Sequence, residues 1–173
     1  MQRGLQKIFI SDVTQVLVTG KGSQANLMEV ITANGTTSIC NASSYKYPNS
    51  LAYASGGFSG NKMIICGGGY RFAEPINVSC YSFGRENGWK LHSIQKDNVV
   101  SSSATIPLLN GLWITGGLSY FPRNYLDATE IVLLNGTRVE GIRLPSPVFR
   151  QCAVKHKDIA ILIGGIFDAF YFY

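Results

Sequence analysis

The sequence has few charged residues, few histidines and no long apolar run. Charged residues make up 14% of the 173 positions, whereas glycine occurs 19 times and aromatic residues account for 12%. Solvated helices usually carry many ion pairs, so this balance favours strands joined by tight turns. Apolar residues make up 46%, which suffices for a packed core. The composition therefore predicts an all-β domain.

The apolar runs are too short for a membrane helix or a signal peptide. A membrane helix needs about 18 consecutive apolar residues, and the run 159–163 ends at Gly164 and Gly165. The N-terminal run 8–10 stops at Ser11 and Asp12. We therefore expect no membrane span and no export signal within this sequence.

The basic residues are not gathered in one segment. The net charge is +5, but the densest stretches, 138–143 and 155–157, are interrupted and carry no interleaved aromatic residues. Nucleic-acid surfaces combine a basic stripe with stacking aromatics. We interpret the excess charge as a solvated surface and expect no nucleic-acid partner.

The sequence also lacks the motifs of common catalytic, cofactor and metal sites. It contains no Gly-x-Ser-x-Gly motif and no Cys-x-x-Cys pair, and the glycines at 67–69 do not open a helix that could bind phosphate. Glu29 and Glu130 occupy equivalent places in a repeat, which favours a repeated structural role over a catalytic pair. We expect no catalytic residue, no metal and no cofactor.

What the sequence does contain is a repeat, in which an apolar stretch ends in glycine. The four copies are at 17–20, 64–67, 113–116 and 161–164. Their final glycines, Gly20, Gly67, Gly116 and Gly164, are spaced by 47, 49 and 48 residues, and a second glycine follows the last three, at Gly68, Gly117 and Gly165. A fixed period of this length predicts a repeated structural unit.

Each copy contains one or two hairpins. The first hairpins turn at 11–12, 59–61, 110–111 and 157–158. Asn110-Gly111 is the clearest signal, because a two-residue hairpin of this type needs positive φ at both corners. A second hairpin follows in the first three units, with strands near 28–31, 78–83 and 129–132. Four strands in about 48 residues predict a β-propeller blade, with almost no helix and with glycine pairs where a Cβ has no space.

These units resemble the kelch repeat, in which apolar residues, a double glycine and spaced aromatics follow one another. Cys66-Gly67-Gly68, with Tyr81 or Phe83 and then Trp89, is the best copy. The third copy lacks the tryptophan, the first has Lys21 in place of the second glycine, and the resemblance extends from about 8 to 165. The copies are also similar in style to divergent invertebrate kelch proteins, in which a cysteine often precedes the glycine pair.

The resemblance implies a single kelch-type propeller domain over residues 1–173, of about three and a half blades. The blades are expected at approximately 5–45, 46–95, 96–145 and, in part, 146–173. A typical kelch disc has six or seven blades, so this arc would leave apolar surface and a strand edge uncovered. Three alternatives follow: a fragment of a larger propeller, a small closed ring, or self-association through the open blade edges.

Kelch propellers generally bind other proteins through loops on one face, so the resemblance implies a non-catalytic protein-interaction module. The partner's identity stays open. An extracellular glycan-binding propeller or glycoprotein is the alternative. A related class of copper oxidases, similar to galactose oxidase, needs two histidines at one site. Here His92 and His156 occupy non-equivalent places in the repeat, so we expect no copper site.

Aromatic residues and arginines in the longer connections are the candidates for a binding surface, because these residue types dominate interface energetics. They are Tyr45, Tyr47, Arg71, Phe72, Arg85, Tyr120, Phe121 and Arg123. The structural alternative is that large loop aromatics pack over the end of their own blade.

Cysteines and glycosylation motifs bear on the cellular compartment. Cys66 and Cys80 are expected on neighbouring strands, where a disulfide is geometrically feasible, although buried free thiols are an equal alternative. Cys40 and Cys152 complete the set. Asn-x-Ser/Thr motifs occur at Asn34, Asn41, Asn77 and Asn135. Two of these are Asn-Gly-Thr, which is also a hairpin-turn pattern. The motifs and cysteines favour a secreted protein, and the absence of a signal sequence favours a cytoplasmic one.

Overall fold

The computed structural model describes residues 7–10, 14–18, 28–32, 37–38, 47–48, 54–60, 62–67, 79–84, 88–94, 100–120 and 123–167. Before residue 47 it describes the backbone of the strands only. All regular structure in these ranges is β-strand, nineteen strands in total, as the composition predicted. None of the described residues belongs to a helix that is long and apolar enough to cross a membrane.

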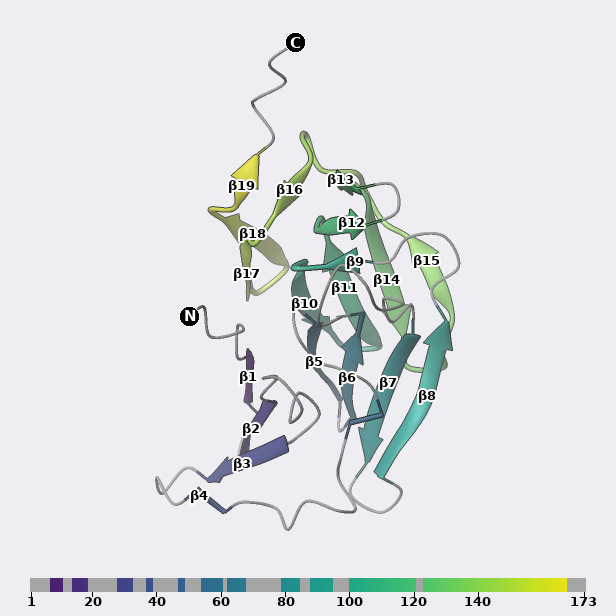
Figure 1. Cartoon of the computed structure of the whole chain (residues 1–173), viewed down its shortest axis with the longest axis vertical. Helices are drawn as coiled ribbons and strands as arrows, with labels where there is room; N and C mark the ends of the chain where they lie inside the picture. Colours follow the sequence, from purple (N-terminus) through teal and green to yellow (C-terminus); the bar gives the residue numbers. More distant parts are fainter. Residues whose placement is uncertain are drawn as a thin grey trace.

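Three four-stranded antiparallel sheets form the body of the described structure (Figure 1). Sheet 1 consists of β1 (Lys7–Ile10), β2 (Thr14–Val18), β3 (Met28–Thr32) and β4 (Thr37–Ser38). Sheet 2 consists of β5 (Ser55–Ser59), β6 (Lys62–Cys66), β7 (Ser79–Gly84) and β8 (Gly88–Ile94). Sheet 3 consists of β10 (Ala104–Leu108), β11 (Gly111–Thr115), β14 (Thr129–Leu133) and β15 (Arg138–Glu140). Each sheet is two consecutive hairpins, which confirms the predicted four-strand unit.

Sheet 4 is a two-stranded hairpin of β17 (Cys152–His156) and β18 (Ile159–Ile163). Five shorter strands complete the described structure: β9 (Val100–Ser101), β12 (Leu118–Tyr120), β13 (Arg123–Tyr125), β16 (Val148–Phe149) and β19 (Ile166–Phe167). β9 pairs with β12, β12 with β13, and β16 with β19. The sequence analysis missed these five strands, because two or three residues are too few to show a period.

The predicted positive φ at the Asn110-Gly111 turn is wrong. Leu108 pairs with Gly111, so the two loop residues are Leu109 and Asn110, and Gly111 already belongs to β11. Among the described residues, positive φ is found at neither Asn110 nor Gly111. Glycine is required at 111 for another reason: a Cβ there would lie 2.4 Å from the Val132 carbonyl oxygen of the neighbouring strand.

The last two units match residue by residue over twenty positions. The strand boundaries of β9, β10, β11 and the start of β12 recur 48 residues later as those of β16, β17, β18 and β19. Even the unusual left-handed residue before the first hairpin recurs, as Ser102 (φ 56°) and Arg150 (φ 58°). The repeat seen in the sequence is therefore a repeat of backbone conformation.

The first strands of successive sheets lie side by side. β5 contacts β1 and β10, and β10 contacts β17. Ser59 Oγ donates a hydrogen bond to the Leu108 carbonyl (2.8 Å), and Thr105 Oγ1 donates one to the Gly56 carbonyl (2.6 Å). Each of these bonds joins equivalent positions, 49 residues apart. Because the first strands of neighbouring sheets are joined at equivalent positions, the sheets lie side by side in the order in which they occur along the chain.

The glycine pairs have the backbone that the sequence predicted. Gly116 and Gly117 have φ values of 56° and 112°, and Gly164 and Gly165 have 68° and 104°. Such values are strained for any residue with a Cβ. Gly67 also has a positive φ, of 66°, whereas Gly20 and Gly68 lie outside the described residues.

The apolar core has two parts, one on each face of β6. Ile64 and Cys66 point toward sheet 3 and pack with Leu112, Ile114 and Val132. On the opposite face, the buried residues Met63 and Ile65 pack with Tyr47, and Phe58, Tyr81, Phe83 and Trp89 are packed against them. This alternation shows why β6 is apolar at four consecutive positions: both of its faces are buried.

Candidate functional site at the glycine end of the sheets

The five short strands gather at the end of sheets 3 and 4 where the glycine pairs lie (Figure 1). Gly116 and Gly117 connect β11 to β12, and Gly164 and Gly165 connect β18 to β19. The Gly117 amide donates to the Val148 carbonyl (2.8 Å), and a Cβ on Gly116 would lie 2.4 Å from that same oxygen. The glycines therefore allow the segment entering sheet 4 to pack directly on the end of sheet 3. We refer to this region as the glycine end.

A hairpin projects from the glycine end between the second and third strands of sheet 3. β12 and β13 pair so that Leu118 lies opposite Tyr125 and Tyr120 lies opposite Arg123. Tyr120 and Arg123 were both predicted as binding residues, and the register places them side by side at the tip of one hairpin. Phe121, between them, lies outside the described residues.

An aromatic stack supports this hairpin from the next unit. The Tyr125 and Phe149 rings are stacked, with centroids 4.5 Å apart and planes at 15°. The guanidinium of the exposed residue Arg150 lies 5.4 Å from the centroid of the Phe149 ring. Phe149 is nearly buried at 9% exposure, whereas Arg150 is held over it and faces solvent. An arginine held on an aromatic ring is pre-organised for contact with a carboxylate.

Backbone and side-chain hydrogen bonds fix the segment that carries Phe149 and Arg150. The Arg150 amide donates to the Ser102 carbonyl (2.9 Å), and the Val148 amide donates to the Leu126 carbonyl (3.1 Å). Gln151 is buried, and its Nε2 donates to the carbonyl (2.9 Å) and to Oγ1 (3.0 Å) of Thr115. The glycine end is thus a rigid support for its exposed side chains.

Tyr47 does not belong to an exposed contact surface. Its side chain is completely buried, and its ring meets those of Tyr81 and Trp89 edge to face at centroid distances of 5.3 and 4.8 Å. Burial, reinforced by Tyr81, raises the pKa of Tyr47 far above its usual value. The expectation for this residue is corrected for a physical reason: a ring with aromatic neighbours is more stable in the core than in water. Trp89 has a structural role in the same cluster.

Four other predicted binding residues lie outside the described residues: Tyr45, Arg71, Phe72 and Arg85. They stay predictions. The sequence analysis missed Tyr125, Phe149 and Arg150. The only sequence signal for the last two is their place 48 residues after Ser101 and Ser102, and this signal indicates position in the repeat without indicating function.

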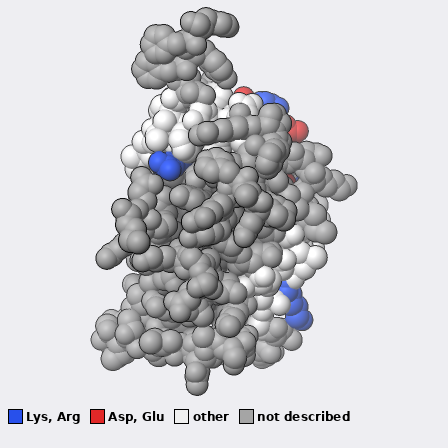
Figure 2. All heavy atoms as spheres, viewed as in Figure 1, with Lys and Arg blue, Asp and Glu red and all other residues white. Residues whose placement is uncertain are grey.

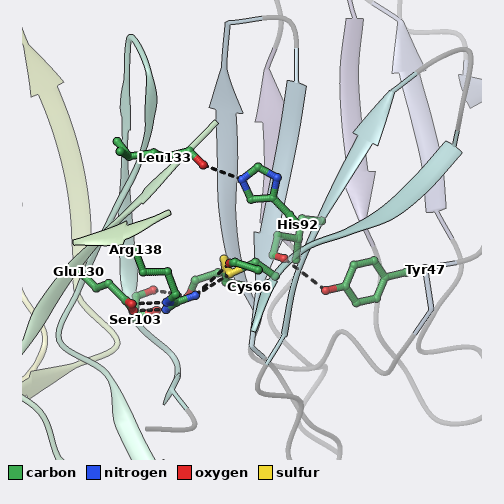
Figure 3. The surroundings of a disulfide bond; sticks show 11 residues. Tyr47, Cys66, His92, Ser103, Glu130, Leu133 and Arg138 are labelled. Atoms are coloured by element: carbon green, nitrogen blue, oxygen red, sulfur yellow. Dashed lines mark hydrogen bonds and ion pairs between the residues drawn. A yellow bond between two sulfur atoms is a disulfide. The ribbon is translucent and has the colours of Figure 1, made fainter. Parts of the chain in front are cut away.

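The interface between sheets 2 and 3 contains a disulfide (Figure 3). Cys66 on β6 and Cys80 on β7 lie directly opposite each other in the register, and their sulfur atoms are 2.03 Å apart. Both residues are buried, at 4% and 0% exposure. Of the two alternatives left open by the sequence, the disulfide is therefore the one that the structure contains. Cys152 is exposed and forms no disulfide, and Cys40 lies outside the described residues.

Arg138 joins the outer strand of sheet 3 to this disulfide. Its guanidinium forms a two-pronged ion pair with Glu130 on the adjacent strand. The Nη1 atom also reaches Cys80 Sγ (3.3 Å) and Ser93 Oγ (3.2 Å) in sheet 2. As Figure 3 shows, Glu130 and Arg138 point from one sheet toward the sulfur atoms of the other. Glu130 thus has the structural role expected for it, with an arginine as its partner. The Glu29 side chain is outside the described residues.

The two histidines lie in different sheets. His92 Nε2 donates to the Leu133 carbonyl (2.7 Å), which links β8 to the turn of sheet 3 (Figure 3). His156 is exposed at the end of β17, beside the hairpin turn. The described ranges contain no group of three or more histidine, cysteine, aspartate or glutamate residues that could hold a metal ion.

One of the four glycosylation motifs can be placed. Asn135 and Thr137 are exposed in the turn between β14 and β15, and the Thr137 amide donates to Asn135 Oδ1 (2.9 Å). The Asn-Gly-Thr sequence therefore forms a turn, as one of its two interpretations predicted. The same turn leaves the asparagine accessible to modification. Asn34, Asn41 and Asn77 lie outside the described residues.

No protein-family model matches this chain, and no curated protein matches it either.

Proposed function

We propose that the chain forms kelch-type β-propeller blades and binds another protein through its glycine end. Three features support the propeller: the recurring four-strand units, the hydrogen bonds between equivalent first strands, and the glycine pairs of matching conformation. The proposal counts about three and a half blades, the half blade being β17 and β18.

The observation that carries the binding role is the juxtaposition of aromatic and arginine residues at the glycine end. Tyr120 and Arg123 lie opposite each other in the hairpin, and Arg150 lies on the Tyr125–Phe149 stack. Rigid aromatics and arginines are the residue types that contribute most binding energy at protein interfaces. The residues come from two consecutive units, so the fold and not a single loop assembles them.

The arginines define the chemistry of the expected partner. Arg123 and Arg150 are cations at one end of the molecule, which favours an acidic protein surface with carboxylates in reach. A non-catalytic role is consistent with the placement of the histidines, because His92 binds a backbone carbonyl and His156 lies on another sheet.

Charge reversal tests this proposal. We would compare proteins retained from a cell extract by the wild type, by Arg123→Glu/Arg150→Glu and by the control Arg143→Glu, each with a verified thermal midpoint. Arg143 is exposed, pairs with Asp127 and takes no part in the stack, so it provides the same charge change outside the stack. Proteins that bind the wild type and the control but not the double variant would support the proposal. An identical set for all three would overturn it.

A second proposal concerns the compartment: the chain is a secreted glycoprotein. The buried Cys66–Cys80 disulfide and the exposed Asn135 favour it together, because both disulfides and N-glycans form along the secretory route. Expression behind a secretion signal, followed by intact-mass measurement with and without a glycosidase, tests it. We expect a sugar mass that Asn135→Gln reduces. An unmodified Asn135 in the secreted protein would contradict the glycoprotein assignment.

A further inference from the structure

The outer face of sheet 4 exposes apolar residues, whereas the equivalent residues of sheets 2 and 3 are buried. In the register of β17 and β18, Cys152 lies opposite Ile163, Val154 opposite Ile161, and His156 opposite Ile159. Directly opposed residues share one face of an antiparallel pair. We call this set the open face; it consists of Cys152, Val154, His156, Ile159, Ile161 and Ile163.

The open face is the counterpart of the surface by which sheet 2 packs on sheet 3. Ile161 and Ile163 are the equivalents of Ile64 and Cys66, which are 0% and 4% exposed in the interface between those sheets. On the open face, Ile161 and Ile163 are 43% and 55% exposed. Within the described residues, the same strand position therefore has a packing partner in sheet 2 and none in sheet 4.

Sheet 3 gives the same comparison at closer range. Ile106 and Thr115 are 1% and 0% exposed, whereas their equivalents Val154 and Ile163, 48 residues later, are 50% and 55% exposed. Gln151 contacts Thr115, and β17 contacts β10, so sheet 4 covers sheet 3 on this side. No further sheet within the described residues covers sheet 4.

We propose that the open face packs against the open face of a second copy of this chain, about a twofold axis. A partner for an apolar sheet face must itself present an apolar, uncharged sheet face. Four of the eleven exposed large hydrophobic residues lie on the open face: Val154, Ile159, Ile161 and Ile163. Three more, Leu162, Ile166 and Phe167, lie elsewhere on β18 and β19. The other four are dispersed over the described surface: Leu91, Leu109, Val139 and Ile142. The complementary surface that this chain offers is therefore the same open face, which is the condition for an isologous dimer.

The charges are compatible with this arrangement. The open face contains no lysine, arginine or acidic residue, and its one titratable base, His156, lies at the turn end of the hairpin. A twofold axis through the centre of the face, near Val154 and Ile161, makes the two hairpins run in opposite directions. The turn ends of the two copies, each with His156 and Lys157, then lie at opposite ends of the contact. Like charges are thereby kept apart.

The visible surface around β17, β18 and β19 agrees with this account. In Figure 2 it is mostly white, with a small blue group among the uncharged atoms. Two five-residue strands make a small contact compared with stable dimers, so the association is expected to be weak and concentration-dependent. The association uses other residues than the partner-binding role at the glycine end, so separate variants test the two proposals.

Sedimentation velocity of the purified chain over a range of concentrations tests the proposal. We expect a monomer at low micromolar concentration and a growing dimer fraction at higher concentration. Ile161→Lys should weaken the dimer at least tenfold, whereas Ile142→Lys, the same change at an 82% exposed site off the face, should leave it unchanged. A wild type that stays monomeric throughout would overturn the proposal, as would equal effects of the two variants.

Cysteine cross-linking tests the geometry. In a Cys40→Ser/Cys152→Ser background, Val154→Cys and Ile161→Cys should both form an interchain disulfide under mild oxidation, because each lies near the proposed axis. Ile142→Cys should not. Pairing of two β18 edges would place Ile161 near its copy and keep Val154 on the far strand. Cross-linking of Ile161→Cys alone would therefore reject face-to-face packing.

Discussion

The hairpin of β10 and β11 and the hairpin of β17 and β18 have the same strand lengths, turn positions and following glycine pair, yet their burial is opposite. Ile106 and Thr115 are completely or almost completely buried, whereas their equivalents Val154 and Ile163 are 50% and 55% exposed. The difference lies in the surroundings. β11 pairs with β14 and packs on sheet 2, whereas β18 pairs only with β17 within the described residues.

An apolar pattern is often taken to indicate both a strand and its burial. This comparison shows that the two have different causes. The period of the pattern and the glycine that ends it determine the hairpin. The neighbouring sheets determine how much of the surface of that hairpin is buried.

The largest difference is expected between Ile64→Ala and Ile161→Ala. Ile64 is buried between two sheets, so its truncation removes apolar contacts and leaves a cavity, at a cost of about 2–5 kcal/mol. Ile161 occupies the equivalent place but is 43% exposed, so we expect less than about 1 kcal/mol. Urea unfolding monitored by tryptophan fluorescence measures both, at a concentration where the chain is monomeric. Equal losses would show that the burial contrast is wrong.

The disulfide is expected to contribute nearly as much. Replacing Cys66 and Cys80 by serine opens a loop with a sequence separation of 14 and should cost about 3 kcal/mol through the entropy of the unfolded chain. Cys152→Ser, at the exposed equivalent of a buried position, should change stability by less than about 0.5 kcal/mol. Thermal unfolding of both variants, without reductant, gives the comparison. Similar midpoints for the two would contradict the stabilising role of the pair.

The glycine pairs offer a third comparison. Both Gly116 and Gly164 have positive φ, so alanine should cost about 1–2 kcal/mol at either site through backbone strain. A Cβ at 116 would also lie 2.4 Å from the Val148 oxygen, whereas one at 164 meets no atom within 4 Å. We expect Gly116→Ala to be the more destabilising by about 1–3 kcal/mol. Denaturant titration decides, and a larger effect at 164 would reject the tight packing of the glycine end.

The smallest contrast concerns two ion pairs of sheet 3. Arg138→Ala should cost about 1–2 kcal/mol, because Arg138 bonds Glu130, Ser93 and Cys80 at a partly buried interface. Arg143→Ala should cost at most about 0.5 kcal/mol, because its pair with Asp127 is exposed. A salt titration of stability checks the assignment: the Arg143 effect should vanish at high salt, while most of the Arg138 effect persists.

Much of the fold could be predicted because its signals are local. The hairpins ending at Gly67, Gly116 and Gly164, and the second hairpins after the first three, follow from apolar stretches, turn residues and spacing. The placement of Cys66 and Cys80 on adjacent strands made their disulfide feasible, although the sequence left free thiols as an equal alternative. The Asn110-Gly111 turn was misassigned by one residue, because glycine serves two needs, positive φ and close approach of a neighbouring strand, and the sequence does not distinguish them.

The candidate site was much less predictable. The loop aromatics were predicted as binding residues from their residue type alone. One of them, Tyr47, is a core residue, because its burial depends on Tyr81 and Trp89 from another part of the chain. Phe149 and Arg150 were missed because they become neighbours of Tyr125 only when consecutive units pack together.

The sequence by itself determined the period, the all-β class, the four-strand unit and the glycines at which second strands end, because each depends on interactions within about 48 residues. The tertiary structure alone decided which equivalent residues are buried, which arginine reaches the disulfide and which face of sheet 4 is left open. Burial and long-range contacts depend on surfaces brought from distant segments, and a repeat that encodes the same hairpin several times carries no record of which copy will have a neighbour.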